Sequence, residues 1–228
     1  MRKDYFSPSL MCGDWLNLRG EIQAYEEAGA EMIHFDIMDT TFTPTTMLPP
    51  SLVQAVRKAT EIPLDIHLMV REPEYFLDNI LPWCDGCYIS VHAEATKQLR
   101  EVVRDIREAG AKPSVALNPG TPLCMIEEVA PYLDMALILN GNAGKSTKQD
   151  IDSHMERKIR RARELLDTCG NETALIEVDG NISFENALRA KRNGANVYVL
   201  GTASIYGKET GVAENIRRLR EYLKESEG

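Results

Sequence analysis

The chain has 228 residues and carries 35 acidic against 26 basic side chains, which gives a formal net charge of −9. This acidity argues against nucleic acid as a partner, because a nucleic-acid-binding surface needs a basic stripe. No run of 18 apolar residues is present, so we expect neither a transmembrane helix nor a membrane partner. The N-terminus lacks the apolar region of a signal peptide, and the five cysteines are scattered, unlike a disulfide framework. We therefore expect a cytoplasmic protein.

Short apolar runs alternate with amphipathic stretches along the chain. Eight runs are rich in Ile, Val, Leu and Met, as in strands buried on both faces: Tyr5–Leu10, Glu31–Ile37, Leu64–Met69, Gly86–Val91, Pro113–Leu117, Met135–Leu139, Thr173–Val178 and Asn196–Leu200. Five stretches have the apolar spacing of helices: Leu16–Glu27, Thr96–Glu108, Ile159–Leu166, Phe184–Asn193 and Ala213–Lys224. Gly29, Gly110 and Gly194 fit the left-handed position that ends a helix.

This alternation predicts an α/β protein, a (β/α)8 TIM barrel that occupies residues 1–228 as a single domain. Eight strand–helix units give about 28 residues each, close to the ~250 residues typical of such barrels. The alternative is an open doubly wound sheet, which normally carries a glycine-rich fingerprint after its first strand. Here that position is Ser9-Leu10-Met11-Cys12-Gly13, at the end of the first predicted strand, and it lacks the fingerprint.

Polar residues follow or end several predicted strands, where the chemistry of a barrel is placed. His34 and Asp36 are two residues apart on the second strand, so their side chains point to the same side. His67 and Asp179 belong to the ends of the third and seventh strands. Taken singly, each could be a hydrogen-bonded core residue. Two imidazoles and two carboxylates that converge would suit a divalent metal, with Zn2+ the usual choice and Fe2+, Mn2+ or Co2+ also accepted.

Six motifs follow one another in order along the chain: Ser7–Leu10, Ile33–Asp39, Leu64–Met69, Val91–Glu94, Leu117–Pro122 and Glu177–Gly180. Together they closely resemble the ribulose-phosphate 3-epimerase family, and the match extends from the first strand to Gly201. The resemblance implies a (β/α)8 barrel that inverts carbon 3 of a ketose phosphate, in the manner of the ribulose 5-phosphate and xylulose 5-phosphate pair. It also implies a homo-oligomer, either a dimer or a hexamer.

The resemblance assigns roles position by position. It implies a metal bound by His34, Asp36, His67 and Asp179, with Asp36 and Asp179 also acting as the catalytic acid/base pair. It implies substrate contacts at Ser9, Met38, His67, Met69, Gly180, Asn181, Gly201 and Thr202. The last four follow strands 7 and 8, where barrels often hold a phosphate. Asn181 stands where the family usually has a second glycine, and asparagine tolerates a positive φ better than most residues.

The implied reaction is a two-carboxylate proton transfer through a metal-stabilised enediolate. Removal of a proton next to a carbonyl creates negative charge, which a metal stabilises as a Lewis acid. Inversion needs proton removal on one face and proton return on the other, so we expect Asp36 and Asp179 to flank the substrate. Methionine side chains such as Met38 and Met69 would supply polarisable walls without exchangeable protons.

Two loops depart from the family pattern. The loop after the sixth predicted strand, Asn140–Gln149, replaces an Asn-Pro-Gly-Phe-Gly-Gly-Gln type run and contains Lys145 and Lys148. The loop after the second, Asp39–Thr45, replaces Asp-Gly-His-Phe-Val-Pro-Asn. Both changes touch parts of the chain that select the substrate. An epimerase for a different ketose phosphate, such as allulose 6-phosphate, is therefore the first alternative, and a non-catalytic sugar-phosphate-binding homologue is the second.

Other signals point elsewhere more weakly. Gly141–Ser146 resembles a phosphate-binding P-loop, but Leu139 stands where that motif needs glycine. Cys84 and Cys87 have the spacing of a redox pair, yet they follow a predicted helix and precede a strand, whereas redox pairs start a helix. A related barrel decarboxylase would need an Asp-x-Lys-x-x-Asp motif, and a Schiff-base aldolase would need a lysine on a strand; the eight predicted strands contain neither. His92 ends the fourth strand region, where we expect it to line the pocket.

Overall fold

The computed structural model describes residues 2–145 and 148–226. Over these residues it contains a sheet of eight parallel strands: β1 (Tyr5–Pro8), β2 (Ile33–Met38), β3 (Leu64–Met69), β4 (Tyr88–His92), β5 (Lys112–Leu117), β6 (Met135–Leu139), β7 (Leu175–Asp179) and β8 (Val197–Leu200). Their neighbour order is β1-β8-β7-β6-β5-β4-β3-β2. A bridge between Ser9 and His34 joins the two ends of this order. The sheet is thus a nearly closed barrel, which confirms the predicted fold and excludes the open sheet.

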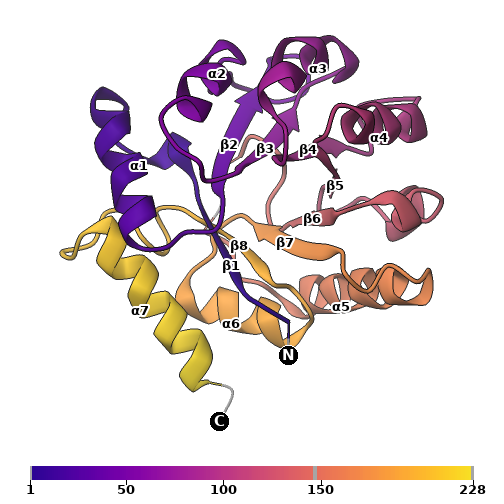
Figure 1. Ribbon diagram of the computed structural model, residues 1–228. Helices are drawn as coiled ribbons and strands as arrows, with labels where there is room; N and C mark the ends of the chain where they lie inside the picture. Colours follow the sequence, from indigo (N-terminus) through magenta and orange to yellow (C-terminus); the bar gives the residue numbers. More distant parts are fainter. Residues whose placement is uncertain (1, 146–147, 227–228) are drawn as a thin grey trace.

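Helices surround the barrel (Figure 1). In the described chain they are α1 (Leu18–Glu27), α2 (Ser51–Arg57), α3 (Glu74–Ile80), α4 (Leu99–Glu108), α5 (Ser153–Thr168), α6 (Phe184–Arg192) and α7 (Val212–Glu225). The last helix, α7, packs beside α1, so the first and the last α-helix of the described chain are neighbours around the barrel (Figure 1). None of these helices is long and apolar enough to cross a bilayer.

From the sequence we expected eight strand–helix units but located only five helices, and neither α2 nor α3 was among them. Each of these two helices has seven residues and buries two apolar side chains, too few for a periodic pattern. Between β5 and β6 the described chain forms 3-10 turns, Leu123–Met125 and Ala130–Tyr132, in place of an α-helix. Pro131 lies inside the second turn, where its ring disfavours a longer α-helix.

Helix ends follow the predicted chemistry. Gly29, Gly110 and Gly194 have φ angles of +64°, +83° and +102°, as expected for residues that end a helix. At the start of α5, the Asp152 side chain accepts hydrogen bonds from the backbone N–H groups of His154 and Met155. This cap places the helix start six residues before the predicted Ile159, because α5 begins with a polar first turn. Residues Met1, Ser146, Thr147, Glu227 and Gly228 of the predicted domain lie outside the described part.

The barrel interior is layered, with polar groups between two apolar clusters. At one end lie Met32, Tyr88, Met135, Leu175 and Val197. The opposite end, toward the carboxyl ends of the strands, holds an apolar cluster that includes Met38, Met69, Ala116, Leu137 and Leu139. Between them, inward-facing side chains on successive strands are polar and buried: Ser7, His34, Asp65, Ser90, Ser114 and Glu177. Buried polar groups need partners. Ser7 and His34 contact Asp65, and Ser90 donates to Ser114, whereas neither carboxylate oxygen of Glu177 has a hydrogen-bond partner among the described residues.

Candidate metal and active site

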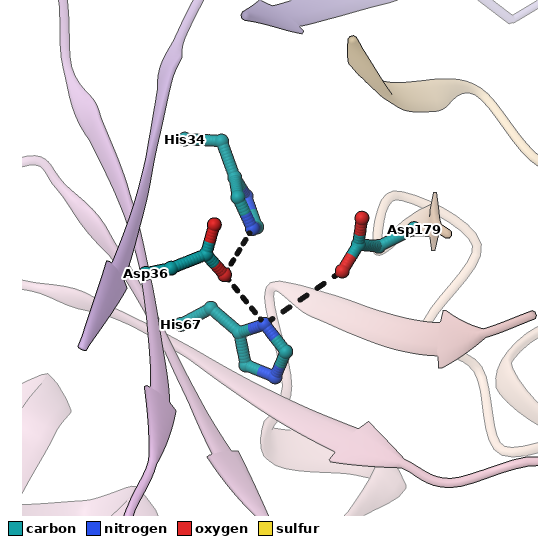
Figure 2. Close-up of side chains that lie close together, drawn as sticks. All are labelled: His34, Asp36, His67 and Asp179. Atoms are coloured by element: carbon teal, nitrogen blue, oxygen red, sulfur yellow. Dashed lines mark hydrogen bonds and ion pairs between the residues drawn. The ribbon is translucent and has the colours of Figure 1, made fainter. Parts of the chain in front are cut away.

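The structure brings the four predicted metal ligands together inside the barrel, on β2, β3 and β7, with His34 the second residue of β2 and Asp179 the last residue of β7. One donor atom from each of His34, Asp36, His67 and Asp179 lies within 4.8 Å of the others. Asp36 Oδ1 is 3.2 Å from His34 Nε2 and 3.4 Å from His67 Nδ1. His67 Nδ1 is in turn 3.9 Å from Asp179 Oδ2. Figure 2 shows that Asp179 enters from the side opposite to the other three residues.

The chemistry of this donor set fits a divalent metal ion. His67 Nδ1 is fully buried and has no hydrogen-bond partner among the described residues. Leaving a buried polar atom unpaired is costly, and here the atom is directed at two carboxylates (Figure 2). Two imidazole nitrogens and two carboxylates form a mixed set that borderline transition metals accept. These four residues could therefore hold such an ion.

Below the four ligands, Asp65 fixes the orientation of His34. The Nδ1 atom of His34 is 2.7 Å from Asp65 Oδ2, which also accepts a 2.8 Å hydrogen bond from the Ser7 hydroxyl. Glu177 Oε1 lies 3.6 Å from the same imidazole nitrogen. Since Nδ1–H donates to a carboxylate, Nε2 is the atom that His34 can offer to a metal. His34, Asp65 and Glu177 could also gather around an ion, but the hydrogen bond already engages His34 Nδ1.

Sequence reasoning missed Asp65 and Glu177. Both are fully buried in the interior of a strand, and a lone acidic residue inside an apolar run carries no positional signal of its own. The signal that could have found them is their spacing. Asp65 precedes His67 by two residues and Glu177 precedes Asp179 by two, so each carboxylate shares a barrel face with a predicted ligand. Burial and the nearby negative charge of Asp65 raise the pKa of Glu177 well above its usual range.

The two candidate acid/base carboxyl groups have opposite electrostatic environments. Burial raises the pKa of Asp36, but His34 and His67 outweigh that effect and lower it below its usual value. Burial raises the pKa of Asp179, and the charge of Asp36 adds to the rise despite the opposing histidines. Burial lowers the pKa of His34, yet Asp36 and Asp65 together raise it well above its usual value. Paired groups with separated pKa values are typical of an acid and a base that work together.

A cavity of about 210 Å3 opens above the four ligands. Its walls include both aspartates and most of the predicted substrate contacts: Ser9, Met38, Met69, Gly180, Asn181, Gly201 and Thr202. The Ser9 hydroxyl donates a 3.2 Å hydrogen bond to Asp36 Oδ2. His67, which we also predicted to touch substrate, and His92 are fully buried and do not belong to the described cavity wall. His92 lies behind His67, with their Nε2 atoms 2.9 Å apart.

The end of the cavity beside β7 has a tightly linked backbone. Gly180 and Asn181 have φ angles of +103° and +53°, which confirms that asparagine adopts the conformation expected at this place. The Asn181 side chain donates to the carbonyl of Gln149 at 3.1 Å. Asn140 donates to the carbonyls of Gln149 and Gly180 at 2.8 and 3.1 Å. The loop after β6 is thus fastened to the loop after β7 on both sides of the positions not described, Ser146 and Thr147.

Sequence reasoning also missed several residues of the cavity wall. These are Met11, Cys12 and Met47. Each lies in a segment that follows β1 or β2, so its place after a strand was the available signal. Met11 and Met47 extend the thioether wall that Met38 and Met69 begin. Burial and the charge of Asp36 raise the pKa of the Cys12 thiol, which keeps it neutral beside the site.

Comparisons with known proteins show the family of the chain. The model of the ribulose-phosphate 3 epimerase family matches residues 5–205. A ribulose-phosphate 3-epimerase of Bacillus subtilis is 38% identical over 202 residues, which cover 89% of this chain and 92% of the relative. One from Methanocaldococcus jannaschii is 35% identical over 218 residues, covering 96% and 90%.

Solved structures show a likeness in fold. A mutant tryptophan synthase alpha-subunit of Pyrococcus furiosus superposes with a TM-score of 0.69 at 19% identity, covering 99% of this chain and all of the other. A phosphoribosyl anthranilate isomerase of Thermus thermophilus gives 0.61 at 14% identity, covering 97% of this chain and 99% of the other. At such low identity these two similarities concern the barrel alone. With the family match and the curated relatives, the chain belongs to the ribulose-phosphate 3-epimerase family, and it is an isomerase of the epimerase class.

Proposed function

We propose that this protein is a metal-dependent 3-epimerase of a ketose phosphate, with ribulose 5-phosphate and xylulose 5-phosphate as the first pair to test. The observation that carries the proposal is the convergence of His34, Asp36, His67 and Asp179, of which the two aspartates line one cavity. The names of the curated relatives support the pentulose pair. The four residues would hold Zn2+, or Fe2+, Mn2+ or Co2+. When bound, the ion would act as a Lewis acid that stabilises the charge of the enediolate.

Asp36 and Asp179 would move the proton at carbon 3. The lowered pKa of Asp36 keeps it ionised and free to take a proton, whereas the raised pKa of Asp179 favours its protonated form, which can return one. The two carboxylates approach from opposite sides (Figure 2), so a substrate between them loses a proton on one face and regains it on the other. In the reverse direction the two roles exchange.

Other residues would orient the substrate and keep water away. The Ser9 hydroxyl donates a hydrogen bond that holds Asp36 in place. The same hydroxyl oxygen can accept a hydrogen bond from a substrate hydroxyl. Met38 and Met69 line the cavity and offer no proton that could exchange with the intermediate. The phosphate would lie at the opposite end of the cavity, against the backbone after β7 and β8 at Gly180–Asn181 and Gly201–Thr202.

A different ketose phosphate, such as allulose 6-phosphate, is the second candidate substrate. A specific observation favours keeping it: both loops that depart from the family pattern contribute to the cavity wall. Thr45 comes from the loop after β2, and Gly141, Asn142 and Lys145 come from the loop after β6. Substitutions in these loops therefore change the surface that meets the substrate, while the four donor residues stay as the family has them. Burial of these polar groups without a metal would cost folding free energy. Their retention therefore disfavours a sugar-phosphate-binding protein without turnover.

Proton exchange at carbon 3 tests the proposal directly. The protein is stripped of metal, reloaded with Zn2+ and incubated in D2O with a panel of pentulose and hexulose phosphates. We expect deuterium incorporation together with a new epimer, seen by NMR, for at least one member, and no exchange in the stripped protein. Equal exchange with and without metal would refute metal dependence. Absence of exchange from every member, with zinc shown to be bound, would refute the epimerase reaction for these substrates.

We also propose that the protein is a cytoplasmic homo-oligomer. The five cysteines are all unpaired, as is usual in a reducing compartment. Trp15 and Leu16, near the cavity wall residues Met11 and Cys12, are 53% and 100% exposed, and large apolar side chains next to one another often mark an interface. Light scattering on the purified protein should give the mass of a dimer or a hexamer, and the mass of a single chain would refute the assembly.

A further inference from the structure

The ligand His67 is the first member of a chain of buried side chains that leads away from the site. Its Nε2 atom is 2.9 Å from Nε2 of His92, and the two rings are stacked with centroids 5.1 Å apart. His92 Nδ1 is 3.2 Å from Glu94 Oε2. Both histidines are fully buried. Two imidazole nitrogens at this distance share one hydrogen. Which of the two rings carries it depends on the group that contacts His92 from the other side.

Glu94 is the group that contacts His92 from that side, and its hydrogen bonds fix its protonation state. Its Oε1 atom faces donors from the loop after β5: the backbone N–H and side-chain amide of Asn118, at 3.1 and 3.3 Å, and the Thr121 hydroxyl. Burial raises the pKa of Glu94, but hydrogen bonds from His92 and Thr121 outweigh that effect and lower it to about 2. Glu94 is therefore a carboxylate, which only accepts hydrogen bonds.

The positions of the hydrogens follow step by step. Since Glu94 only accepts, Nδ1 of His92 must carry the hydrogen between them. A neutral His92 then has a lone pair on Nε2, so the hydrogen between the two rings belongs to Nε2 of His67. A neutral His67 is left with its lone pair on Nδ1, the buried atom that has no partner among the described residues. That atom is the one directed at Asp36 and Asp179.

We propose that Glu94 and His92 are positioning residues that hold His67 in the tautomer with a free Nδ1, and so make it a metal ligand. The consequence for metal binding rests on the proposed function, whereas the tautomer itself does not. Ligand histidines usually donate their second N–H to a carboxylate or a carbonyl. His34 does so directly with Asp65, but His67 reaches its carboxylate through a second imidazole. The two histidines would accordingly bind one ion through different atoms, Nε2 of His34 and Nδ1 of His67.

The donors around Glu94 make an isosteric variant informative. In Glu94→Gln, the amide oxygen is expected to take the Oε1 place, because the backbone N–H of Asn118 can only donate. The amide NH2 then faces Nδ1 of His92 and donates to it. His92 Nδ1 then accepts a hydrogen bond, so the hydrogen of a neutral His92 lies on Nε2. The hydrogen bond between the two rings is thereby reversed, with His92 as the donor and His67 as the acceptor. His67 is then expected to carry its hydrogen on Nδ1, where it blocks a metal.

Nitrogen NMR of histidine-labelled protein reads these tautomers directly. The chain has four histidines, and single substitutions assign their signals. The spectra are recorded without metal and at a pH above the histidine titration range. In the unmodified protein we expect His67 to be protonated on Nε2, and in Glu94→Gln to be protonated on Nδ1. The matched control is Glu127→Gln, the same change at an exposed glutamate, which should leave all four signals unchanged.

Zinc affinity is the second readout. Competition with a chelator should show a 10–100-fold loss of affinity in Glu94→Gln and none in Glu127→Gln. His67 protonated on Nδ1 in the unmodified protein, or the same tautomer in both Glu94 forms, would overturn the inference. Failure of the unmodified protein to bind zinc, with the expected tautomers present, would instead refute the proposed metal site and leave the positioning role intact. Circular dichroism of each variant establishes that it is folded.

Discussion

His34 and Asp65 are register partners on β2 and β3, and a 2.7 Å contact joins Nδ1 of the imidazole to Oδ2 of the carboxylate. Neither side chain has any exposed surface. A carboxylate in the barrel interior thus fixes the ring whose Nε2 faces Asp36, a residue of the cavity wall. The second oxygen of Asp65, Oδ1, is buried and has no partner among the described residues. In an asparagine at this position, the amide oxygen would therefore take the place of Oδ2, which contacts His34 and Ser7.

The variant Asp65→Asn separates the orientation of His34 from the charge behind it. Its amide oxygen can still accept the hydrogen of His34 Nδ1, so the tautomer should persist, but the loss of negative charge makes the imidazole a weaker ligand. We expect zinc affinity to fall about 10-fold, the low end of the effect seen for such supporting residues. Chelator competition measures it, and the nitrogen NMR signal of His34 should not change tautomer. A swapped tautomer would show that the charge, and not the oxygen, holds the ring.

The variant Asp179→Asn should separate proton exchange from inversion. It keeps an oxygen that can face the metal but cannot carry the proton, so epimerisation should fall by about 10²–10⁴-fold. Asp36 would still exchange the proton of the epimer that presents it to that face. We therefore expect deuterium to enter one epimer without inversion, measured by NMR in D2O at equal metal content. Loss of exchange from both epimers to the same extent would contradict separate roles for the two aspartates.

Lys145 should contribute to substrate binding. Its side chain belongs to the cavity wall and carries the charge that a phosphate attracts. In Lys145→Ala we expect KM for the best ketose phosphate to rise about 10-fold, which corresponds to about 1.4 kcal/mol of binding free energy, with little change in kcat. Lys148→Ala is the matched control, because Lys148 is an exposed residue of the same loop. Equal effects of the two substitutions would indicate that the positive charge of the loop attracts the phosphate from a distance, without a specific contact between Lys145 and the substrate.

Asn181 should tolerate glycine better than alanine. Its φ of +53° costs a residue with a Cβ roughly 1–2 kcal/mol, and asparagine offsets part of this through its side chain. Both substitutions remove the hydrogen bond to the carbonyl of Gln149, but only alanine keeps the backbone strain. We expect Asn181→Ala to unfold in urea with a free energy roughly 1 kcal/mol below that of Asn181→Gly. Equal stability of the two variants would show that the strain is released by movement of the loop.

His92 should make the protein sensitive to mild acid. Burial lowers its pKa from 6.5 to about 4, with His67 adding to the shift and Glu94 opposing it. Between these two pH values the unfolded chain binds a proton that the folded chain does not, so stability falls as the pH drops from 6.5 to 4. The loss from this group is about 3 kcal/mol. Urea unfolding of the metal-free protein should show this loss, and His92→Phe should lack it. Parallel pH profiles for the two proteins would contradict the prediction.

The barrel and the four candidate ligands could be predicted because both depend on local order in the sequence. His34 and Asp36 share one face of β2 because they are two residues apart, and the parallel strands β3 and β7 direct His67 and Asp179 to the same interior. The supporting chain of His92 and Glu94 could not be assembled in this way. Each was visible at the end of its strand, but their direction depends on donors from a loop more than twenty residues away. Helices α2 and α3 escaped prediction because seven residues provide too few turns for a periodic signal.

The seam of the barrel lies beside the candidate site. Within the described residues, β1 meets the β2 segment through the Ser9–His34 bridge and two hydrogen bonds to the carbonyl of Phe6, whereas the hydrogen-bonded strand order runs from β2 through β7 and β8 to β1. The four candidate metal ligands lie on β2, β3 and β7, and Ser9 lies across the seam from His34. The hydrogen bond from the Ser9 hydroxyl to Asp36 therefore adds a side-chain link at the one junction where the described neighbouring strands form no ladder.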